Sequence, residues 1–343
     1  MPFAAPDPHP ESEPVVWALH DGKAGMRSQA LGLAEATGFV VVEKPLSVRK
    51  PWAWLPPQAW PAPLRAVRED GLPLAPPWPD LVVGCGRNTA MPALAIKRAS
   101  GGVTIAAQVQ DPGVGRGEFD LMVVPEHDRL RGAGVLVTKG AIHRVTPARL
   151  AAERRRFPAL DTLPRPVLAV LVGGSNRAYR LTLERLGEIA DAVAAALRET
   201  GGSALVTPSR RTGGEGIALF RERLAGIPAQ IWGGTGDNPY YAYLATADAV
   251  LVSADSVSMI SEAAATGKPV HVFDLAPRLA GRRDAKFARF HQAMQAAGIV
   301  RPFAGRIERW SYAPLDDTAR AGAALRELAL ARIAQGRRPA APV

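Results

Sequence analysis

The stretch AVLVSADSVSMISEAAATGKPVHVF, residues 249–273, indicates the fold of this chain. An apolar run at 249–252 predicts a buried strand, and the polar turn 253–258 leads into a helix that is expected to continue through 265. The glycine and proline at 267–269 then turn the chain into a second apolar strand, 270–273. A strand, a helix and a second strand in this order predict parallel strands joined by a right-handed crossover.

The same order recurs on both sides of this stretch. Each apolar strand is followed by a turn that is rich in glycine or hydroxyl groups, and in most cases a helix comes next. Further strands of this kind are expected at 15–19, 81–83, 103–109, 121–124, 167–172 and 204–207. Strands that alternate with helices predict an α/β fold with parallel sheets. Because the pattern restarts near residue 160, we expect two Rossmann-like domains with a cleft between them.

The expected boundaries follow from shifts in composition. We expect a flexible leader at 1–14, an N-terminal Rossmann-like acceptor domain at 15–157, a linker at 158–166, a C-terminal Rossmann-like nucleotide-binding domain at 167–305, a segment at 306–335 whose helix spans about 317–334, and a tail at 336–343. Packing of that last helix back onto the N-terminal domain is one option. The leader is rich in proline and acid, which is typical of neither a signal nor a transit peptide.

Size and charge narrow the class of protein. A chain of 343 residues is longer than one hydrophobic core usually serves, and no run approaches the roughly 18 to 20 apolar residues that cross a bilayer. The net charge of +10 favours an anionic partner. The single cysteine, Cys85, excludes an internal disulfide and a cysteine-based zinc site, and it indicates the reducing cytosol.

The strand-to-helix turns are the expected binding elements, because ligands of doubly wound sheets lie beyond the carboxyl ends of the strands. Glycine lets the backbone approach a phosphate, and a helix N-terminus supplies N–H groups and positive potential. No dinucleotide fingerprint or P-loop is present. The predicted nucleotide- and phosphate-binding residues are Gly173, Gly174, Ser175, Asn176, Ser209, Arg210, Arg211, Asp255, Ser256, Ser258 and Glu262.

Within that set, the helix that follows Asp255 gives the most specific hypothesis. Ser256 and Ser258 would lie at its N-terminus, where hydroxyl and N–H groups can hold a diphosphate. Glu262 comes four residues after Ser258 on the same face, where its carboxylate could accept both hydroxyls of a ribose. The alternative makes Ser256 an ordinary N-cap and Glu262 a surface partner of Lys268.

The N-terminal domain offers candidates for a general base. Asp21 is the first choice and Asp111 the second, while His20 could orient an acceptor or assist proton transfer. In the alternative interpretation, the two aspartates are turn residues and His20 is a hydrogen-bonded loop imidazole. The expected acceptor-side loop residues are Gly22, Lys23, Gly25, Gly86, Arg87 and Asn88.

Residues 44–68 form a stretch that is rich in tryptophan and proline and is unlike the strand-to-helix turns. Trp52, Trp54, Leu55 and Trp60 are interleaved with prolines and flanked by basic residues. Indole rings favour bilayer interfaces and cations favour anionic headgroups, so one hypothesis is peripheral contact with an anionic membrane at its inner face. The other hypothesis is a proline-rich loop that packs its tryptophans on the N-terminal domain.

Two resemblances follow from these motifs. The stretch from Asp255 to Glu262, with its exit Gly267-Lys268-Pro269-Val270, resembles the donor-nucleotide site of GT-B glycosyltransferases and of UDP-N-acetylglucosamine 2-epimerases. The chain as a whole, over about 15–305, resembles the bacterial relatives of the plant elongated-mitochondria (mitochondrial fission) family. The motifs that carry this second resemblance are residues 20–25 with Gln29, 110–112, 173–179, 207–212, 238–240, 255–262, 286–287 and 289–291.

These resemblances imply a GT-B-like fold and a glycosyltransferase activity, without naming a substrate or a catalytic residue. The leading hypothesis is a glycosyltransferase that uses a nucleotide-diphosphate sugar and a lipid-linked or glycan acceptor, as in cell-envelope glycan synthesis. The sequence has no Asp-x-Asp triplet, so Arg210, Arg211 and the helix start are expected to replace a metal, and no cofactor is expected. The alternatives are a nucleotide-sugar epimerase and a non-catalytic adaptor related to fission factors. No nucleic-acid partner is expected, because no recognition module is present.

Overall fold

The computed structural model describes residues 13–278 and 285–336, which form two compact units. Unit 1 contains the chain through Arg144 together with the segment from Asp316, and unit 2 runs from Val145 to Leu315. Most of the leader predicted at 1–14 and of the tail predicted at 336–343 lies outside the described residues. None of the helices in the described parts of the chain is long and apolar enough to span a membrane.

Unit 1 is built on a sheet whose described strands follow the order β3-β2-β1-β4-β5-β6-β7. Its strands are β1 (Val15–His20), β2 (Val40–Val48), β3 (Val67–Glu69), β4 (Leu81–Cys85), β5 (Ile105–Val109), β6 (Leu121–Pro125) and β7 (Val135–Thr138). Its helices are α1 (Ala24–Ala36), α2 (Pro63–Ala66), α3 (Arg87–Ala99) and α10 (Asp317–Ala334), with short 3-10 turns η1 (Trp52–Trp54), η2 (Pro57–Ala59), η3 (Arg116–Glu118) and η4 (Glu126–Asp128). Every neighbouring pair is parallel except β2 and β3.

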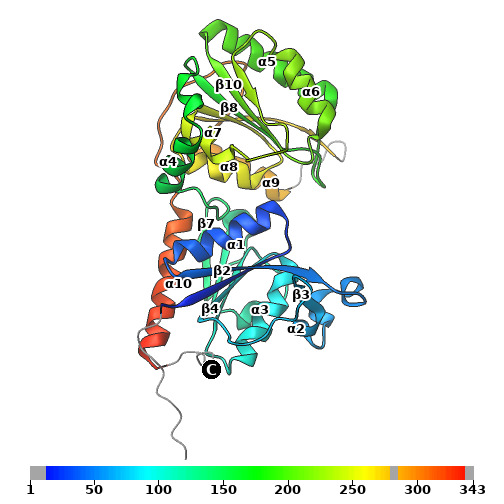
Figure 1. The fold of residues 1–343 in the computed structure, drawn as a ribbon, viewed down its shortest axis with the longest axis vertical. Helices are drawn as coiled ribbons and strands as arrows, with labels where there is room; N and C mark the ends of the chain where they lie inside the picture. Colours follow the sequence, from blue (N-terminus) through cyan, green and yellow to red (C-terminus); the bar gives the residue numbers. More distant parts are fainter. Residues whose placement is uncertain (1–12, 279–284, 337–343) are drawn as a thin grey trace, which may run out of the picture. The chain divides into compact units, whose positions relative to one another are not determined.

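Alternation along β1 divides the core of unit 1 into two layers. Val16 and Ala18 pack with α1 and α10, whereas Trp17 and Leu19 pack with α2 and α3 on the opposite face of the sheet (Figure 1). Buried strands with apolar residues on both faces are typical of parallel sheets that are covered by helices on each side. The C-terminal helix therefore completes the core of unit 1, where Gly322 allows α10 to lie directly against Ala36 of α1.

Unit 2 repeats the architecture with the strand order β11-β10-β8-β12-β13-β15, all parallel. Its strands are β8 (Val167–Val172), β9 (Tyr179–Arg180), β10 (Ser203–Pro208), β11 (Ala229–Ile231), β12 (Ala249–Ser253), β13 (Val270–Phe273), β14 (Ala276–Pro277) and β15 (Val300–Pro302). Its helices are α4 (Pro147–Arg156), α5 (Leu183–Thr200), α6 (Gly213–Arg223), α7 (Tyr240–Thr246), α8 (Val257–Ala264) and α9 (Ala285–Ala296), with the 3-10 turn η5 (Pro158–Thr162). The strands β9 and β14 form a small separate antiparallel pair.

The boundary between the units differs from the expected one. Helix α4 was placed in the N-terminal domain and 158–166 in a linker, but both belong to unit 2. The reason is packing: α4 lies against α7, and Leu160 is buried with Val167 and Tyr243. The α/β fold with two Rossmann-like halves is confirmed.

Candidate functional site

The loops after β8, β10 and β12 all leave the carboxyl edge of the sheet in unit 2. From β8 the sheet extends through β10 to β11 on one side and through β12 to β15 on the other, so β8 and β12 flank the point where the strand order reverses. In open α/β sheets this switch point is where ligands bind. The loops concerned are 173–178, 209–212 and 254–256, and they contain most of the binding residues expected from the sequence.

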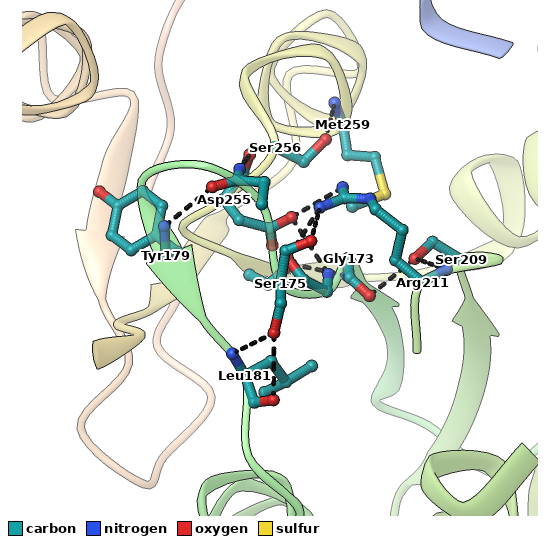
Figure 2. A network of polar contacts seen from close by, with 12 residues as sticks. Gly173, Ser175, Tyr179, Leu181, Ser209, Arg211, Asp255, Ser256 and Met259 are labelled. Atoms are coloured by element: carbon teal, nitrogen blue, oxygen red, sulfur yellow. Dashed lines mark hydrogen bonds and ion pairs between the residues drawn. The ribbon is translucent and has the colours of Figure 1, made fainter. Parts of the chain in front are cut away.

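The buried carboxylate of Asp255 joins these three loops. Its side chain is fully buried; Oδ2 accepts the backbone N–H of Gly174 at 3.1 Å and pairs with Nη2 of Arg211 at 2.8 Å (Figure 2). Arg211 reaches back to the first loop, since its Nη1 donates to the carbonyl oxygens of Gly174 at 2.8 Å and Ser175 at 3.2 Å. One carboxylate and one guanidinium thus hold the loops together as a clamp.

Gly173 and Gly174 make room for this clamp. A Cβ on Gly173 would lie 2.2 Å from Oδ1 of Asp255, and one on Gly174 would lie 2.5 Å from Cβ of Arg211. The N–H groups of both glycines are already used, because that of Gly173 donates to Oγ of Ser253 at 2.7 Å. Their role therefore differs from the expected one: they allow the clamp to form and do not offer N–H groups to a phosphate.

The other polar residues of the three loops shape the loops themselves. Oδ1 of Asn176 accepts the N–H groups of Ala178 and Tyr179 at 2.7 and 2.8 Å. Oγ of Ser175 accepts the N–H of Leu181 at 3.0 Å, and Oγ of Ser209 donates to the carbonyl of Gly173 at 2.7 Å (Figure 2). Arg210, by contrast, is exposed and makes no hydrogen bond or ion pair within the described parts of the chain.

The N-terminus of α8 opens from the same edge. Oγ of Ser256 accepts the N–H of Met259 at 3.2 Å, so the alternative interpretation of Ser256 as an N-cap applies. Ser258 is partly exposed in the first turn, and no hydrogen bond among residues 13–278 and 285–336 uses its N–H or that of Val257. These N–H groups and the helix dipole leave a positive end that can bind an anion.

Glu262, on the same helix, is held by a residue from α7. Its side chain is buried, and its Oε2 accepts the hydroxyl of Tyr240 at 2.5 Å. Burial and the charge of Glu262 raise the pKa of Tyr240 well above its usual value, which keeps the phenol a hydrogen-bond donor. Tyr240 is placed in turn by Asn238, whose Oδ1 accepts its backbone N–H at 3.0 Å.

Lys268 is not the surface partner of Glu262 that the alternative interpretation supposed. Its Nζ donates to the carbonyl oxygens of Leu244 and Ala245 at 2.7 and 2.6 Å, at the C-terminal end of α7. Burial lowers the pKa of Lys268 to about 8, and the two carbonyls satisfy the ammonium group in that position. Glu262 and Lys268 thus contact opposite ends of the same helix, α7.

In unit 1, His20 is at the end of β1 with both ring nitrogens engaged. Nδ1 accepts the N–H of Gly22 at 3.1 Å, so the ring proton is on Nε2, which donates to Oε1 of Glu43 at 2.9 Å. Arg27 pairs with both carboxylate oxygens of Glu43, and its hydrogen bonds, together with that from His20, hold the pKa of Glu43 at about 2. His20 is therefore positioned to order the turn at Gly22 and has no free acceptor nitrogen.

The two candidate aspartates of unit 1 have different surroundings. Asp111 forms two parallel hydrogen bonds with Arg116, at 2.8 and 2.6 Å, and accepts the N–H of Gly113 at 2.9 Å, which matches its interpretation as a turn residue. Asp21 is half-buried and contacts Lys23, through the backbone N–H at 3.3 Å and through an ion pair with Nζ. Asp21 thus keeps a carboxylate beside solvent at the sheet edge.

The residues expected to form an acceptor-side loop lie at the switch point of the sheet in unit 1, beyond β1 and β4. Gly22 and Gly86 have φ values of +78° and +87°, a region that favours glycine, and Gly86 is the N-cap residue of α3. Arg87 is exposed and donates to Oε1 of Gln58 at 3.2 Å. The others, Lys23, Gly25 and Asn88, are exposed or partly exposed in the turns and first helical residues of that edge.

The model of the protein family described as "Mitochondrial fission ELM1" matches residues 24–329, which is most of the chain. The chain belongs to this family. The mitochondrial fission protein ELM1 of Arabidopsis thaliana is 32% identical over 282 residues, covering 74% of this chain and 65% of the plant protein. This ELM1-family chain thus spans less than two thirds of the length of that relative.

Solved structures show the fold class of this ELM1-family chain. A putative UDP-N-acetylglucosamine 2-epimerase from Listeria monocytogenes has a TM-score of 0.51 and 14% identity, covering 94% of this chain and 91% of its own. The UDP-GlcNAc 2-epimerase from Methanocaldococcus jannaschii has a TM-score of 0.50 and 12% identity, covering 74% and 77%. The fold is GT-B-like, as the sequence motifs implied.

Two features of the site were not assigned from the sequence. Tyr240 belongs to the Asn-Pro-Tyr motif that carried the family resemblance, but nothing in its sequence position shows that it contacts Glu262, 22 residues further on. Glu43 and Arg27 were missed because β2 was not recognised as a strand. The apolar run 40–42 just before Glu43 was the available signal.

Proposed function

We propose that this ELM1-family chain is a metal-independent glycosyltransferase whose unit 2 binds the nucleotide diphosphate of an activated sugar. The observation that carries the proposal is the composition of the edge beyond β8 and β12. The loop after β10 contributes an exposed arginine, Arg210, and α8, which follows β12, contributes available N–H groups at its N-terminus and a carboxylate, Glu262, that Tyr240 holds. These are the groups that a diphosphate and a ribose require.

The proposed roles follow from the contacts of each residue. The charge of Arg211 is matched by Asp255, so Arg210 and the α8 N-terminus are the groups that would neutralise the diphosphate as it leaves the sugar. Glu262 would accept the ribose hydroxyls. Tyr240 would orient the carboxylate of Glu262 through its 2.5 Å hydrogen bond.

For the acceptor we propose Asp21 of unit 1 as the general base. In an inverting transfer the acceptor oxygen bonds to the anomeric carbon, the bond to the diphosphate breaks, and the acceptor proton passes to the carboxylate. His20 is less suited because Gly22 already occupies its acceptor nitrogen, and Asp111 is less suited because Arg116 takes both of its oxygens. Both oxygens of Asp21 are also engaged, by the backbone N–H and Nζ of Lys23, but the Lys23 side chain is 69% exposed, so an acceptor hydroxyl can replace its Nζ.

Titration calorimetry with UDP, GDP and CMP, and then with their sugars, tests the proposal. The names of the structural neighbours, both UDP-N-acetylglucosamine 2-epimerases, make UDP the first ligand to try. Binding of at least one nucleotide is expected. If none binds at millimolar concentration, the donor site and with it the glycosyltransferase proposal are wrong.

The Glu262→Gln substitution should weaken UDP binding roughly tenfold, because a charge-assisted hydrogen bond to a ribose hydroxyl becomes a neutral one. The amide keeps the side-chain volume and an oxygen that can accept from Tyr240. The wild type should also prefer UDP over 2′-deoxy-UDP, and Glu262→Gln should lose most of that preference. Calorimetry on the four combinations measures both effects.

The control variant for this comparison of UDP with 2′-deoxy-UDP is Glu199→Gln, on the exposed end of α5. It removes the same charge from unit 2 and should change neither the affinity nor the preference for ribose. A deoxyribose penalty that is equal in the wild type and in Glu262→Gln would show that Glu262 does not contact the ribose.

The Tyr240→Phe substitution should reduce the preference for UDP over 2′-deoxy-UDP by severalfold, and by less than Glu262→Gln does. The reason is that the carboxylate keeps its charge but loses the hydroxyl that orients it. The same calorimetric comparison measures the effect. A Phe variant with full ribose preference would contradict the positioning role of Tyr240.

Family membership favours a second candidate, a non-catalytic adaptor, because the Arabidopsis relative is named as a mitochondrial fission protein. Product analysis with a lipid-extract acceptor separates the candidates. Transfer of sugar to the acceptor supports the glycosyltransferase, and a change in the nucleotide sugar alone would indicate an epimerase. Nucleotide binding with no turnover of any sugar would favour the adaptor.

A further inference from the structure

The segment 49–60 of unit 1 exposes large apolar side chains. It leaves the carboxyl end of β2 as the two 3-10 turns η1 and η2. Within it Trp54 is 73% exposed and Leu55 44% exposed. A tryptophan left in water at this extent is unusual in a folded protein, because its large ring normally contributes to the core or to an interface.

A second tryptophan, Trp60, fixes the backbone conformation that leaves Trp54 exposed. Trp60 is buried, and its Nε1 donates to the carbonyl oxygens of Trp52 at 3.0 Å and Leu55 at 3.2 Å. Trp60 and the partly buried Trp52 pack in the core layer beneath α2 and α3. The inner indole therefore fixes the backbone around Trp54 and Leu55, which are held outward.

The charged residues within 49–68 are all basic. Residues 49–68 contain Arg49, Lys50, Arg65 and Arg68 and no acidic residue. Arg49 and Lys50 are exposed, and Nζ of Lys50 lies 5.9 Å from the centre of the Trp54 ring. This combination suits the surface of an anionic bilayer. An exposed indole and leucine can lie at the depth of the headgroups, and the neighbouring cations can contact the anionic groups.

We propose that segment 49–60 docks unit 1 on the surface of a bilayer that contains anionic lipid. Trp54 and Leu55 enter the interface, while Arg49 and Lys50 contact the headgroups. Gln58, within the segment, accepts from Arg87 at 3.2 Å, so the docking segment lies beside the acceptor-side edge of unit 1. The docking does not depend on the proposed glycosyl transfer, since it requires only these exposed side chains.

Flotation of the full chain with vesicles tests the proposal. Wild type should float with phosphatidylcholine vesicles that contain phosphatidylglycerol and stay behind with phosphatidylcholine alone. The double variant Trp54→Ser/Leu55→Ser should bind roughly tenfold less or weaker still, because it loses the buried apolar area. Arg49→Gln/Lys50→Gln should lose about fivefold for each cation removed.

Matched controls lie on unit 2. Leu183→Ser replaces a leucine that is 49% exposed, and Arg198→Gln/Arg221→Gln removes two exposed arginines. Both should float like the wild type. The proposal is overturned if the wild type does not float with anionic vesicles, or if it floats equally with neutral ones. It is also overturned if the control variants lose as much binding as the segment variants, since the net charge alone would then explain attachment. Circular dichroism melts should be unchanged in all four variants, because every altered side chain is exposed.

Discussion

Replacing Asp255 with alanine should destabilise unit 2 by about 3 kcal/mol and abolish the proposed nucleotide binding. The substitution leaves the N–H of Gly174 without its acceptor and removes the partner of Arg211. Loss of one member of a buried ion pair costs about 3–5 kcal/mol. The lower end applies because the Arg211 side chain is 43% exposed and can be hydrated. Urea denaturation, with hydrogen exchange in β8 and β12 as the local readout, measures the loss.

Two further variants define what this result means. Asp255→Asn keeps the volume and an oxygen for Gly174, so it should lose less stability than Asp255→Ala. Asp191→Ala removes an exposed carboxylate whose pair with Arg223 is 3.4 Å long, and it should leave unfolding nearly unchanged. If Asp255→Ala unfolds at the same urea concentration as the wild type, the loops after β8 and β12 are held by other contacts.

Asp255 also shows what could be read from the sequence and what could not. Strand periodicity and the Gly or Ser turns placed residues 173–176, 209–212 and 255–258 at the same sheet edge, because parallel strands end together. The sequence pattern does not reveal which polar atoms already have hydrogen-bond partners within the protein. Gly173 and Gly174 are the clearest case, since the same glycine-rich turn can either cradle a phosphate or accommodate a buried carboxylate.

The elements that were missed have physical reasons. Strand β2 contains Glu43, Lys44 and Pro45 after an apolar start, and its proline and charges obscured the alternation. Ser28 is a good N-cap type, but it lies inside helix α1, which begins at Ala24 with no side-chain cap. Local preference for a cap was overridden there by the packing of the first turn, in which Met26 contacts the sulfur of Cys85. The last helix was easier to predict, because its good helix formers are continuous from 317 to 334.

Acid should destabilise unit 1 through His143. This residue follows β7, is 3% exposed, and has no hydrogen-bond partner for either ring nitrogen among the described residues. It is enclosed by α1 and α10: a Cβ on Gly32 would lie 2.4 Å from the carbonyl oxygen of His143, whose N–H donates to Oγ1 of Thr318 at 3.1 Å. Burial lowers the pKa of His143 from 6.5 to about 4, although the nearby charge of Asp317 acts in the opposite direction.

The direction of the effect follows from proton binding. Between pH 6.5 and 4 the unfolded chain binds a proton at this residue and the folded chain does not. The contribution of His143 to stability is therefore complete above pH 6.5 and decreases as the pH falls to about 4, by about 3 kcal/mol in total. Below pH 4 both states are protonated and the loss stops growing.

Substitution of His143 with leucine isolates this titration from the carboxylates, which titrate in both proteins. Protection factors for α1 and α10 at pH 7 and pH 4.5 report the local stability of unit 1. The wild type should lose roughly 2–3 kcal/mol more than His143→Leu over that interval, since most of the unfolded histidine titrates within it. An equal loss in both proteins would mean that His143 is hydrated and titrates normally. A smaller loss in the wild type would mean that Asp317 stabilises the protonated ring, which would reverse the sign.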